Sequence, residues 1–314
     1  MKVAVIGAGG VGCFYGTRLL GAGHDVHFLM RSDLETVRAR GLTVHSPDGD
    51  FQGPVAAYGD PAEIGAADLV ICSLKATALD VACALVAPCV GPDTRGLVMM
   101  NGLGVEEPFA EAFGAWRVLG GMAFVCINRV EPGVVRHLAY GQLLFGHCLD
   151  DKAMTEEVAD LFRAAGVDVV TPGSLKRARW QKLVWNIPFS TLAISAGGVT
   201  TQHILEDDGL RNLARELMVE TIAAANGHAC AIEAEPLIEE MFTTTSTMGA
   251  YRPSMLVDYE QKRPLEVEAI LGEPVRRARQ VGVATPRLEM NYHLVRMLDR
   301  INRGELENPT GEKP

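Results

Sequence analysis

Three glycines near the N-terminus have the spacing of a phosphate-binding turn. Gly7, Gly9 and Gly12 follow the apolar run 3–6 and precede an amphipathic stretch over 14–20. In a G-x-G-x-x-G turn the first glycine permits a tight bend, the second lets the backbone approach a pyrophosphate, and the third lets the helix pack closely on the strand. A purely structural turn is the alternative. The order strand, turn, helix favours a dinucleotide bound along Gly7, Ala8, Gly9, Gly10, Val11 and Gly12.

The residue after the second expected strand, over 26–30, bears on the type of dinucleotide. Here the chain has Arg31, where NAD-binding chains usually carry an Asp or Glu that bonds the ribose 2′-hydroxyl. An arginine can neutralise a 2′-phosphate, and the acids Asp33 and Glu35 come later than usual. We therefore expect NADP(H), while a solvated loop role for Arg31 would leave NAD open.

Two polar residues close apolar runs further along the chain. Lys75 follows residues 69–74, and Asn101 follows residues 97–100. Ligands of a doubly wound sheet bind outside the carboxyl ends of its strands, so both residues are candidates for cofactor contact. The glycines that follow Asn101 suggest backbone close to a ligand such as the nicotinamide ring, although Asn is also an ordinary turn residue.

A stripe of polar residues falls on an expected helix near 174–187. Lys182, Asn186 and Ser190 are four residues apart and share one helical face. Pro188 must kink or end the helix nearby. The flanking tryptophans supply apolar bulk, and partial burial would lower the pKa of the lysine towards a value useful for giving a proton. A surface lysine whose ammonium reaches water is an equally good interpretation of the spacing.

Further polar candidates lie downstream, at Ser254, Asp258 and Glu266. Pro264 is expected to open a helix with Glu266 in its first turn, where the helix dipole favours a carboxylate. That capping role would suffice without a ligand, and Asp258 can equally form an ion pair on a helix surface. The histidines show no H-x-x-x-H or similar spacing, so we expect no metal.

The order of apolar runs predicts the elements that position these residues. Strand-like and helix-like segments alternate through the first half, which predicts an α/β fold with a Rossmann-type doubly wound, mainly parallel sheet. Two short antiparallel strands are expected over 134–145, around Ala139-Tyr140-Gly141. A helix over 151–165 and a last strand over 167–170 follow. The other expected strands are 3–6, 26–30, 69–73, 96–100 and 118–125.

Beyond residue 171 the apolar pattern becomes helical almost throughout, which predicts an all-α second domain. We expect a dinucleotide-binding domain over 1–171, a helical substrate and catalytic domain over 172–302, and a disordered tail over 303–314. The helical domain can pack a homodimer interface or only its own core. Its expected helices are 174–187, 203–226, 233–247, 252–262, 264–280 and 286–302.

Composition limits the partners. The chain has 314 residues and a net charge of −10, whereas a general nucleic-acid binder needs clustered Lys and Arg. No apolar run approaches the roughly 18 residues of a membrane span. The apolar segment at the N-terminus is too short for an export signal. Seven scattered cysteines indicate neither a disulfide framework nor a zinc ribbon. We therefore expect a cytoplasmic protein with no nucleic-acid or membrane partner.

Together these residues resemble the ketopantoate reductase family, also called 2-dehydropantoate 2-reductase, in the class related to 6-phosphogluconate dehydrogenases. Four signatures match in order across nearly the whole chain, and the last two together are far more specific than the glycine motif. They are Gly7-x-Gly9-x-x-Gly12 with Arg31, then Leu74-Lys75 and Asn101-Gly102-x-Gly104, then Trp180-x-Lys182-Leu183-x-x-Asn186, and finally Ser254-Met255-Leu256-x-Asp258 followed by Glu266.

The resemblance implies NADPH-dependent reduction of a small 2-keto acid, ketopantoate, to pantoate, a step towards pantothenate and coenzyme A. Lys182 would be the general acid and Glu266 a carboxylate at the substrate, which agrees with the need of a developing alkoxide for an adjacent proton-donating cation. The resemblance also implies that Asn101 lies near both the nicotinamide and Lys182, and that Lys75 and Arg31 help hold the cofactor. The implied substrate contacts are Asn101, Lys182, Asn186, Ser190 and Ser254.

Three departures from the family pattern bear on the substrate. Ser190 stands where the family commonly has a second Asn, and Tyr251 stands where an Asn often precedes the Ser-Met-Leu motif. Around Glu266 the usual Thr-Glu-Ile-Asp is Leu-Glu-Val-Glu. Fewer amide donors and an added phenol change the pocket, so reduction of another small 2-keto acid or carbonyl is an alternative. A non-catalytic NADP-binding regulator is a second alternative, and it would need neither Lys182 nor Glu266.

Overall fold

The computed structural model describes residues 1–306, which form two compact units. Unit 1 contains Met1–Asn101 and Val105–Leu175, and unit 2 contains Gly102–Gly104 and the chain from Lys176 onward. Each unit has its own hydrophobic core. The short excursion Gly102–Gly104 packs with unit 2, although the sequence predicts a division at residue 171 alone.

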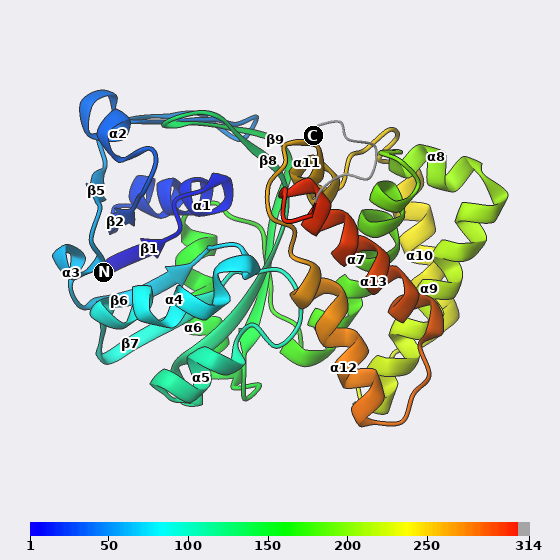
Figure 1. Ribbon diagram of the computed structural model, residues 1–314. Coiled ribbons are helices and arrows are strands. Elements are labelled where there is room, and N and C mark those ends of the chain that lie inside the picture. Colours follow the sequence, from blue (N-terminus) through cyan, green and yellow to red (C-terminus); the bar gives the residue numbers. More distant parts are fainter. Residues whose placement is uncertain (307–314) are drawn as a thin grey trace. The chain divides into compact units, whose positions relative to one another are not determined.

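Unit 1 is built on a ten-stranded sheet (Figure 1). The strand order is β4-β3-β9-β8-β7-β6-β1-β2-β5, and β10 pairs with β9. The central strands pair in parallel, as expected for a doubly wound sheet, while β8 with β9 and β3 with β4 are antiparallel. The strands are β1 (Lys2–Ile6), β2 (Asp25–Leu29), β3 (Leu42–His45), β4 (Phe51–Gly53), β5 (Ala56–Tyr58), β6 (Ala67–Cys72), β7 (Val90–Val98), β8 (Val118–Glu131), β9 (Val134–His147) and β10 (Val169–Val170).

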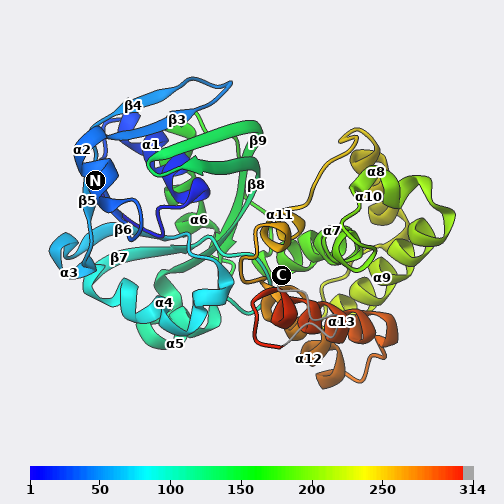
Figure 2. The ribbon, with the colours of Figure 1, turned by 45° about the horizontal axis from the view of Figure 1, so that its top comes forward.

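Helices of unit 1 cover the sheet in two groups (Figure 2). α1 packs beside α6, and α4 packs beside α5. The core forms because β1 and β6 are almost entirely buried apolar runs, as strands covered on both faces must be. The helices are α1 (Gly10–Gly21), α2 (Leu34–Arg40), α3 (Pro61–Ile64), α4 (Leu79–Val86), α5 (Glu107–Phe113) and α6 (Lys152–Ala164).

The prediction of two short strands over 134–145 is wrong. β9 is one strand of 14 residues, and the hairpin turn comes before it, between Glu131 and Val134. Tyr140 has φ 66° and Gly141 has φ 123°, and the register with β8 shifts at this point. The glycine therefore marks a β-bulge, which a local turn signal resembles in the sequence.

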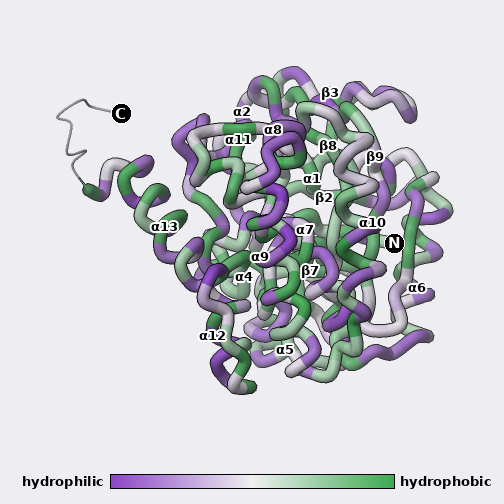
Figure 3. Tube along the Cα trace, turned by 90° about the vertical axis from the view of Figure 1, so that its right-hand side faces the viewer, coloured by the Kyte–Doolittle hydropathy of each residue, from purple (hydrophilic) through white to green (hydrophobic). Residues whose placement is uncertain are grey.

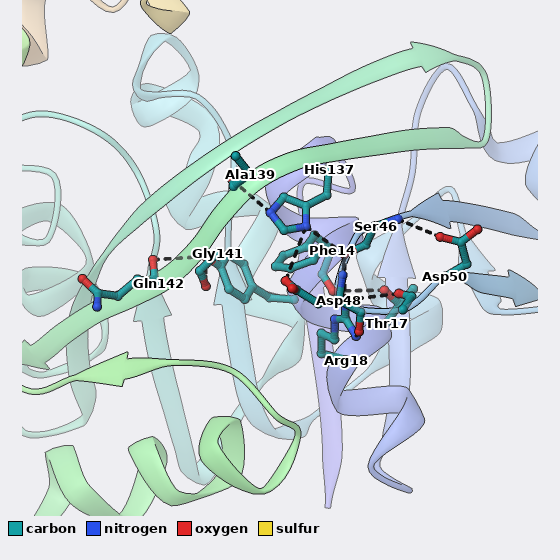
Figure 4. Close-up of polar contacts among 12 residues, drawn as sticks. Phe14, Thr17, Arg18, Ser46, Asp48, Asp50, His137, Ala139, Gly141 and Gln142 are labelled. Carbon is teal, nitrogen blue, oxygen red and sulfur yellow. Dashed lines mark hydrogen bonds and ion pairs between the residues drawn. The ribbon is translucent and has the colours of Figure 1, made fainter. Parts of the chain in front are cut away.

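A buried imidazole ties the β3–β4 connection to β9 and α1 (Figure 4). His137 Nδ1 lies 2.8 Å from Ser46 Oγ, and its Nε2 lies 3.0 Å from the carbonyl oxygen of Ala139. From α1, Arg18 donates to Ser46 Oγ at 2.9 Å and to the carbonyl oxygen of Asp48 at 3.0 Å. These bonds hold the short strands β3 and β4, which the sequence analysis missed, against the main sheet.

Unit 2 is helical throughout, as predicted. The expected helix over 203–226 is two helices, because the chain breaks at Asp207, whose carboxylate accepts the Leu210 N–H at 2.8 Å and caps α9. The exposed residues around this junction are hydrophilic (Figure 3). The helices are α7 (Leu175–Ser195), α8 (Thr201–Glu206), α9 (Asp208–Gly227), α10 (Ala234–Ser246), α11 (Ser254–Glu260), the π-helical η4 (Glu268–Gly272), α12 (Glu273–Gln280) and α13 (Pro286–Asn302).

Pro264 does not open a helix, and this expectation is wrong. The N–H of Leu265 is donated to the Asp299 carboxylate at 3.0 Å and that of Arg263 to the carbonyl oxygen of Asp258 at 2.9 Å. Of these two bonds only the one to Asp299 is long-range, and the segment 263–266 is not helical. The helix starts after Glu266, and the backbone carbonyl of Glu266 accepts the Ile270 N–H at 3.0 Å. Pro188, by contrast, lies inside α7, which continues to Ser195.

The predicted tail over 303–314 is described only in part. Arg303 forms ion pairs with Asp299 at 3.1 Å and with Glu305 at 2.6 Å. Residues 307–314 lie outside the described part of the chain. Among residues 1–306, none of the helices has the length and apolar character needed to cross a membrane.

Candidate active site

The glycine turn of unit 1 joins β1 to α1 and has open space beside Gly9. A Cβ on Gly12 would collide with the carbonyl oxygen of Gly7 and with Ser73 Oγ, which donates to that carbonyl at 2.8 Å. Gly7 has φ 100°, which favours glycine. A Cβ on Gly9 would meet nothing within 4 Å, so the backbone there faces open space. The first turn of α1 carries no acidic residue, and these features fit an anion at the helix N-terminus.

The carboxyl edge of three neighbouring strands brings further candidates together in unit 1. β6 lies between β1 and β7, with Cys72 in register with both Ile6 and Val98. Lys75 is exposed just after β6, and Asn101 is half-buried just after β7. Both residues therefore leave the same edge of the sheet as the glycine turn, which is where such sheets bind dinucleotides.

Asp33, the first acidic residue after Arg31, forms hydrogen bonds within unit 1 through both carboxylate oxygens. Asp33 is only 6% exposed. Its Oδ1 accepts from Ser32 Oγ at 2.8 Å and from Arg129 Nη1 at 2.9 Å, and its Oδ2 accepts the Gly133 N–H at 3.1 Å. Sequence reasoning missed Arg129, because almost a hundred residues separate it from Asp33 and no local pattern marks it. Arg31 itself is exposed.

In unit 2, Lys182 on α7 lies in the field of two charged residues. The pKa of Lys182 is lowered to about 8, mainly by burial and also by the positive charge of Arg179, while the carboxylate of Glu266 acts in the opposite direction. Arg179 and Glu266 are themselves buried. Unit 2 therefore brings Lys182 and Glu266, 84 positions apart in the sequence, close enough for their charges to interact.

The other polar candidates of unit 2 differ in exposure. Ser190 is buried, Asn186 is half-buried, and Ser254 is exposed at the start of α11. Asp258 is buried and forms an ion pair with Arg263 at 2.8 Å, which supports a structural role. Tyr251, one of the departures from the family pattern, has its ring 6.2 Å from that of Trp185.

A backbone contact ties the segment after Asn101 to the π-helical turn after Glu266. The N–H of Glu273 is donated to the carbonyl oxygen of Glu268, five residues back, and residue 274 is a proline without an N–H. The carbonyl oxygen of Ala269 would accept from residue 273 in an α-helix or from residue 274 in a π-helix. Neither residue bonds it here. The N–H of Leu103 does so instead, at 2.9 Å.

Metal ligation has no candidate among residues 1–306. No group of three or more His, Cys, Asp or Glu side chains there is arranged to hold an ion. The seven cysteines are all free thiols, and burial raises the pKa of Cys13 and of Cys72 to about 12. The thiols of Cys13 and Cys72 are therefore poor nucleophiles and ligands, because the thiolate is the reactive form.

Comparison with known proteins gives two family matches. Residues 3–149 match the model described as "Ketopantoate reductase PanE/ApbA", and residues 174–299 match its C-terminal counterpart. A 2-dehydropantoate 2-reductase of Nostoc sp. is 40% identical over 309 residues, which cover 96% of each chain.

Two solved structures are similar over nearly the full length. The 2-dehydropantoate 2-reductase of Geobacter metallireducens is 44% identical with a TM-score of 0.91, covering 95% of this chain and 99% of that one. The enzyme of the same name from Methylococcus capsulatus is 34% identical with a TM-score of 0.89, covering 99% and 100%. Both likenesses span the two units.

Proposed function

This chain belongs to the ketopantoate reductase family, and we propose that it reduces 2-dehydropantoate to pantoate with NADPH. The observation that carries the proposal is the interaction of Lys182 with Glu266 in a chain that also has the phosphate-binding turn. A regulator that only bound the dinucleotide would need neither side chain. Relatives at 40% and 44% identity bear the name of this activity.

Each unit would contribute one part of the reaction. We propose that unit 1 holds the dinucleotide, which supplies the hydride when bound, through the turn Gly7–Gly12 together with Arg31, Lys75 and Asn101. We propose that unit 2 holds the 2-keto acid through Lys182, Asn186, Ser190, Ser254 and Glu266. The domain division predicted from the sequence would then follow the two compact units, apart from the excursion Gly102–Gly104.

Lys182 is suited to give a proton to the alkoxide that develops when the ketone is reduced. With a pKa of about 8 it is mostly an ammonium ion at neutral pH and yet gives up its proton more readily than an ordinary lysine. The carboxylate of Glu266 favours the charged form of Lys182 and so helps to keep the proton on its amine. A cation beside the alkoxide also lowers the barrier electrostatically.

The preference for NADPH rests on the end of β2. An NAD-binding chain uses a carboxylate there to accept from the ribose 2′-hydroxyl. In this chain the residue is Arg31, and both oxygens of the next acid, Asp33, accept hydrogen bonds from its own surroundings. Neither residue is therefore suited to the 2′-hydroxyl, whereas a guanidinium suits a 2′-phosphate.

A second candidate substrate is another small 2-keto acid. Ser190 is buried, and Tyr251 packs beside Trp185, at two positions where the family commonly has asparagine. A hydroxyl and a phenol differ from carboxamides in both size and hydrogen-bonding capacity. These two residues are the reason to test more than one substrate.

The test is NADPH oxidation by the purified protein, followed through the nicotinamide absorbance with 2-dehydropantoate and with a panel of other 2-keto acids. We expect turnover with 2-dehydropantoate well above that with the panel. Lys182→Ala should lower kcat by about 100-fold or more, because general acid catalysis is lost, while NADPH still binds. Lys176→Ala, an exposed lysine of the same helix, is the matched control. Near-normal turnover of Lys182→Ala would rule out the assigned role, and turnover only with another keto acid would select the second substrate.

A further inference from the structure

A second cation lies beside the residue that we assign to the 2′-phosphate of the cofactor. Arg129, near the end of β8, donates from Nη1 to Ser32 Oγ at 3.0 Å and to Asp33 Oδ1 at 2.9 Å. Ser32 directly follows the exposed Arg31. Arg31 and Ser32 of the loop after β2, together with Arg129 of β8, thus provide two guanidinium side chains and a hydroxyl, which are groups that proteins use to bind a phosphate monoester.

The position of Arg129 is fixed by the turn of its own hairpin. The Gly133 N–H is donated to Asp33 Oδ2 at 3.1 Å, and the carbonyl oxygen of Gly133 accepts the Thr43 N–H at 2.9 Å. The turn between β8 and β9 is therefore held from both sides. The Arg129 side chain nevertheless remains 43% exposed, whereas that of Asp33 is only 8% exposed. The guanidinium, and not the carboxylate, is presented to solvent at this loop.

We propose that Arg129 is a second binding residue for the 2′-phosphate of NADPH, positioned by Asp33. The inference rests on the proposed use of NADPH. Asp33 acts in two ways: it holds the guanidinium beside Ser32, and by accepting these bonds it is withdrawn as an acceptor for the 2′-hydroxyl of NADH. A dianionic phosphate then meets two arginines, of which only one is neutralised by a buried acid.

The experiment compares the binding of NADPH and NADH, followed by nicotinamide fluorescence, in the full-length protein and in Arg129→Ala. We expect NADPH to bind about tenfold or more weakly, because a charge-assisted hydrogen bond is lost. NADH binding should not weaken, because NADH lacks the 2′-phosphate. Arg136→Ala is the matched control, since Arg136 is exposed on the same hairpin and removes the same charge. Equal loss for both dinucleotides, or the same small effect as Arg136→Ala, would overturn the proposal.

Two further variants separate phosphate binding from the exposure of Asp33. Arg129→Ala uncovers a buried carboxylate, which could itself repel the phosphate, so the double variant Arg129→Ala with Asp33→Asn removes both charges. Loss of NADPH affinity that persists in the double variant supports direct binding by Arg129, and full recovery contradicts it. Arg129→Lys keeps the charge without the planar fork and should bind NADPH between the wild type and Arg129→Ala. A wild-type protein that binds NADH as tightly as NADPH would overturn the proposed cofactor itself, independently of any variant.

Discussion

Two charges of opposite sign act on the pKa of Lys182. Desolvation has the largest effect, followed by the repulsive charge of Arg179, which is three residues away on the same helix. The carboxylate of Glu266 works in the other direction. The lysine would titrate near its ordinary value if it were a surface residue, which was the alternative interpretation of its spacing. Its environment sets the pH range in which it can serve as an acid.

The pH dependence of kcat/KM should report this environment. Reduction needs protonated Lys182, so kcat/KM should fall as pH rises through about 8. Arg179→Leu removes a positive charge that disfavours the ammonium, so it should raise the pKa and move this fall to higher pH. Arg177→Leu, an exposed arginine nearby, is the control and should leave the profile in place. An unchanged profile in Arg179→Leu would contradict the electrostatic account.

At the scale of single residues, the sequence predicts backbone geometry where local spacing determines it. Gly7, Gly9 and Gly12 could be assigned because a tight strand-to-helix turn imposes its own spacing. The prediction that Lys182 and Glu266 both act at the substrate came only from the resemblance to a family, since the two lie far apart in the sequence. Arg129 was missed altogether, because its partners become neighbours only when the β8–β9 hairpin folds beside the loop after β2.

At the scale of elements, the π-helical turn η4 depends on a segment from elsewhere in the chain. The carbonyl of Ala269 is bonded by Leu103, and a Cβ on Gly102 would collide with the Cβ and the carbonyl oxygen of Ala269. Gly102 also has φ 97°. A π-helical turn of this kind persists when another group satisfies the carbonyl that the helix leaves out, and such turns are frequent at functional sites.

Gly102→Ala should therefore destabilise the protein. Alanine at this position would have to adopt a positive φ, and its methyl group would collide with Ala269. We therefore expect the free energy of unfolding to fall by more than about 1 kcal/mol. Gly173→Ala is the control, because a Cβ there would meet nothing within 4 Å. Urea denaturation of the two variants measures the difference. Equal stability of both variants would show that η4 does not depend on this contact.

The elements that the sequence predicted correctly are those with strong local patterns. The buried strands β1 and β6 and the long helix α13 lie where their apolar spacing puts them. The short strands β3 and β4 escaped prediction, because tertiary bonds such as those of His137 and Arg18 hold them. The same holds for the non-helical segment before η4, where the N–H of Leu265 is donated to Asp299.

For the molecule as a whole, the separate cores of the two units imply that a ligand can stabilise one without the other. The core of unit 1 contains residues of α1, β1 and β2, which flank the proposed dinucleotide site, and the core of unit 2 contains residues of α7 and α9. The two core clusters share no residue. Binding to a folded unit raises its stability by mass action, by about 2.7 kcal/mol at a free ligand concentration 100 times Kd.

NADPH alone should therefore slow amide hydrogen exchange unevenly along the chain. We expect protection in segments 7–12 and 31–33 of unit 1, where the backbone amides would contact the cofactor or lie beside it. The junction of α8 and α9 around Asp207 in unit 2, which is exposed and hydrophilic, should exchange as in the free protein. Exchange followed by mass spectrometry with NADPH, and with NADH for comparison, measures this directly. Protection confined to unit 2 would contradict the assignment of the dinucleotide to unit 1, whereas equal protection by both cofactors would leave that assignment standing and remove the role proposed for the 2′-phosphate.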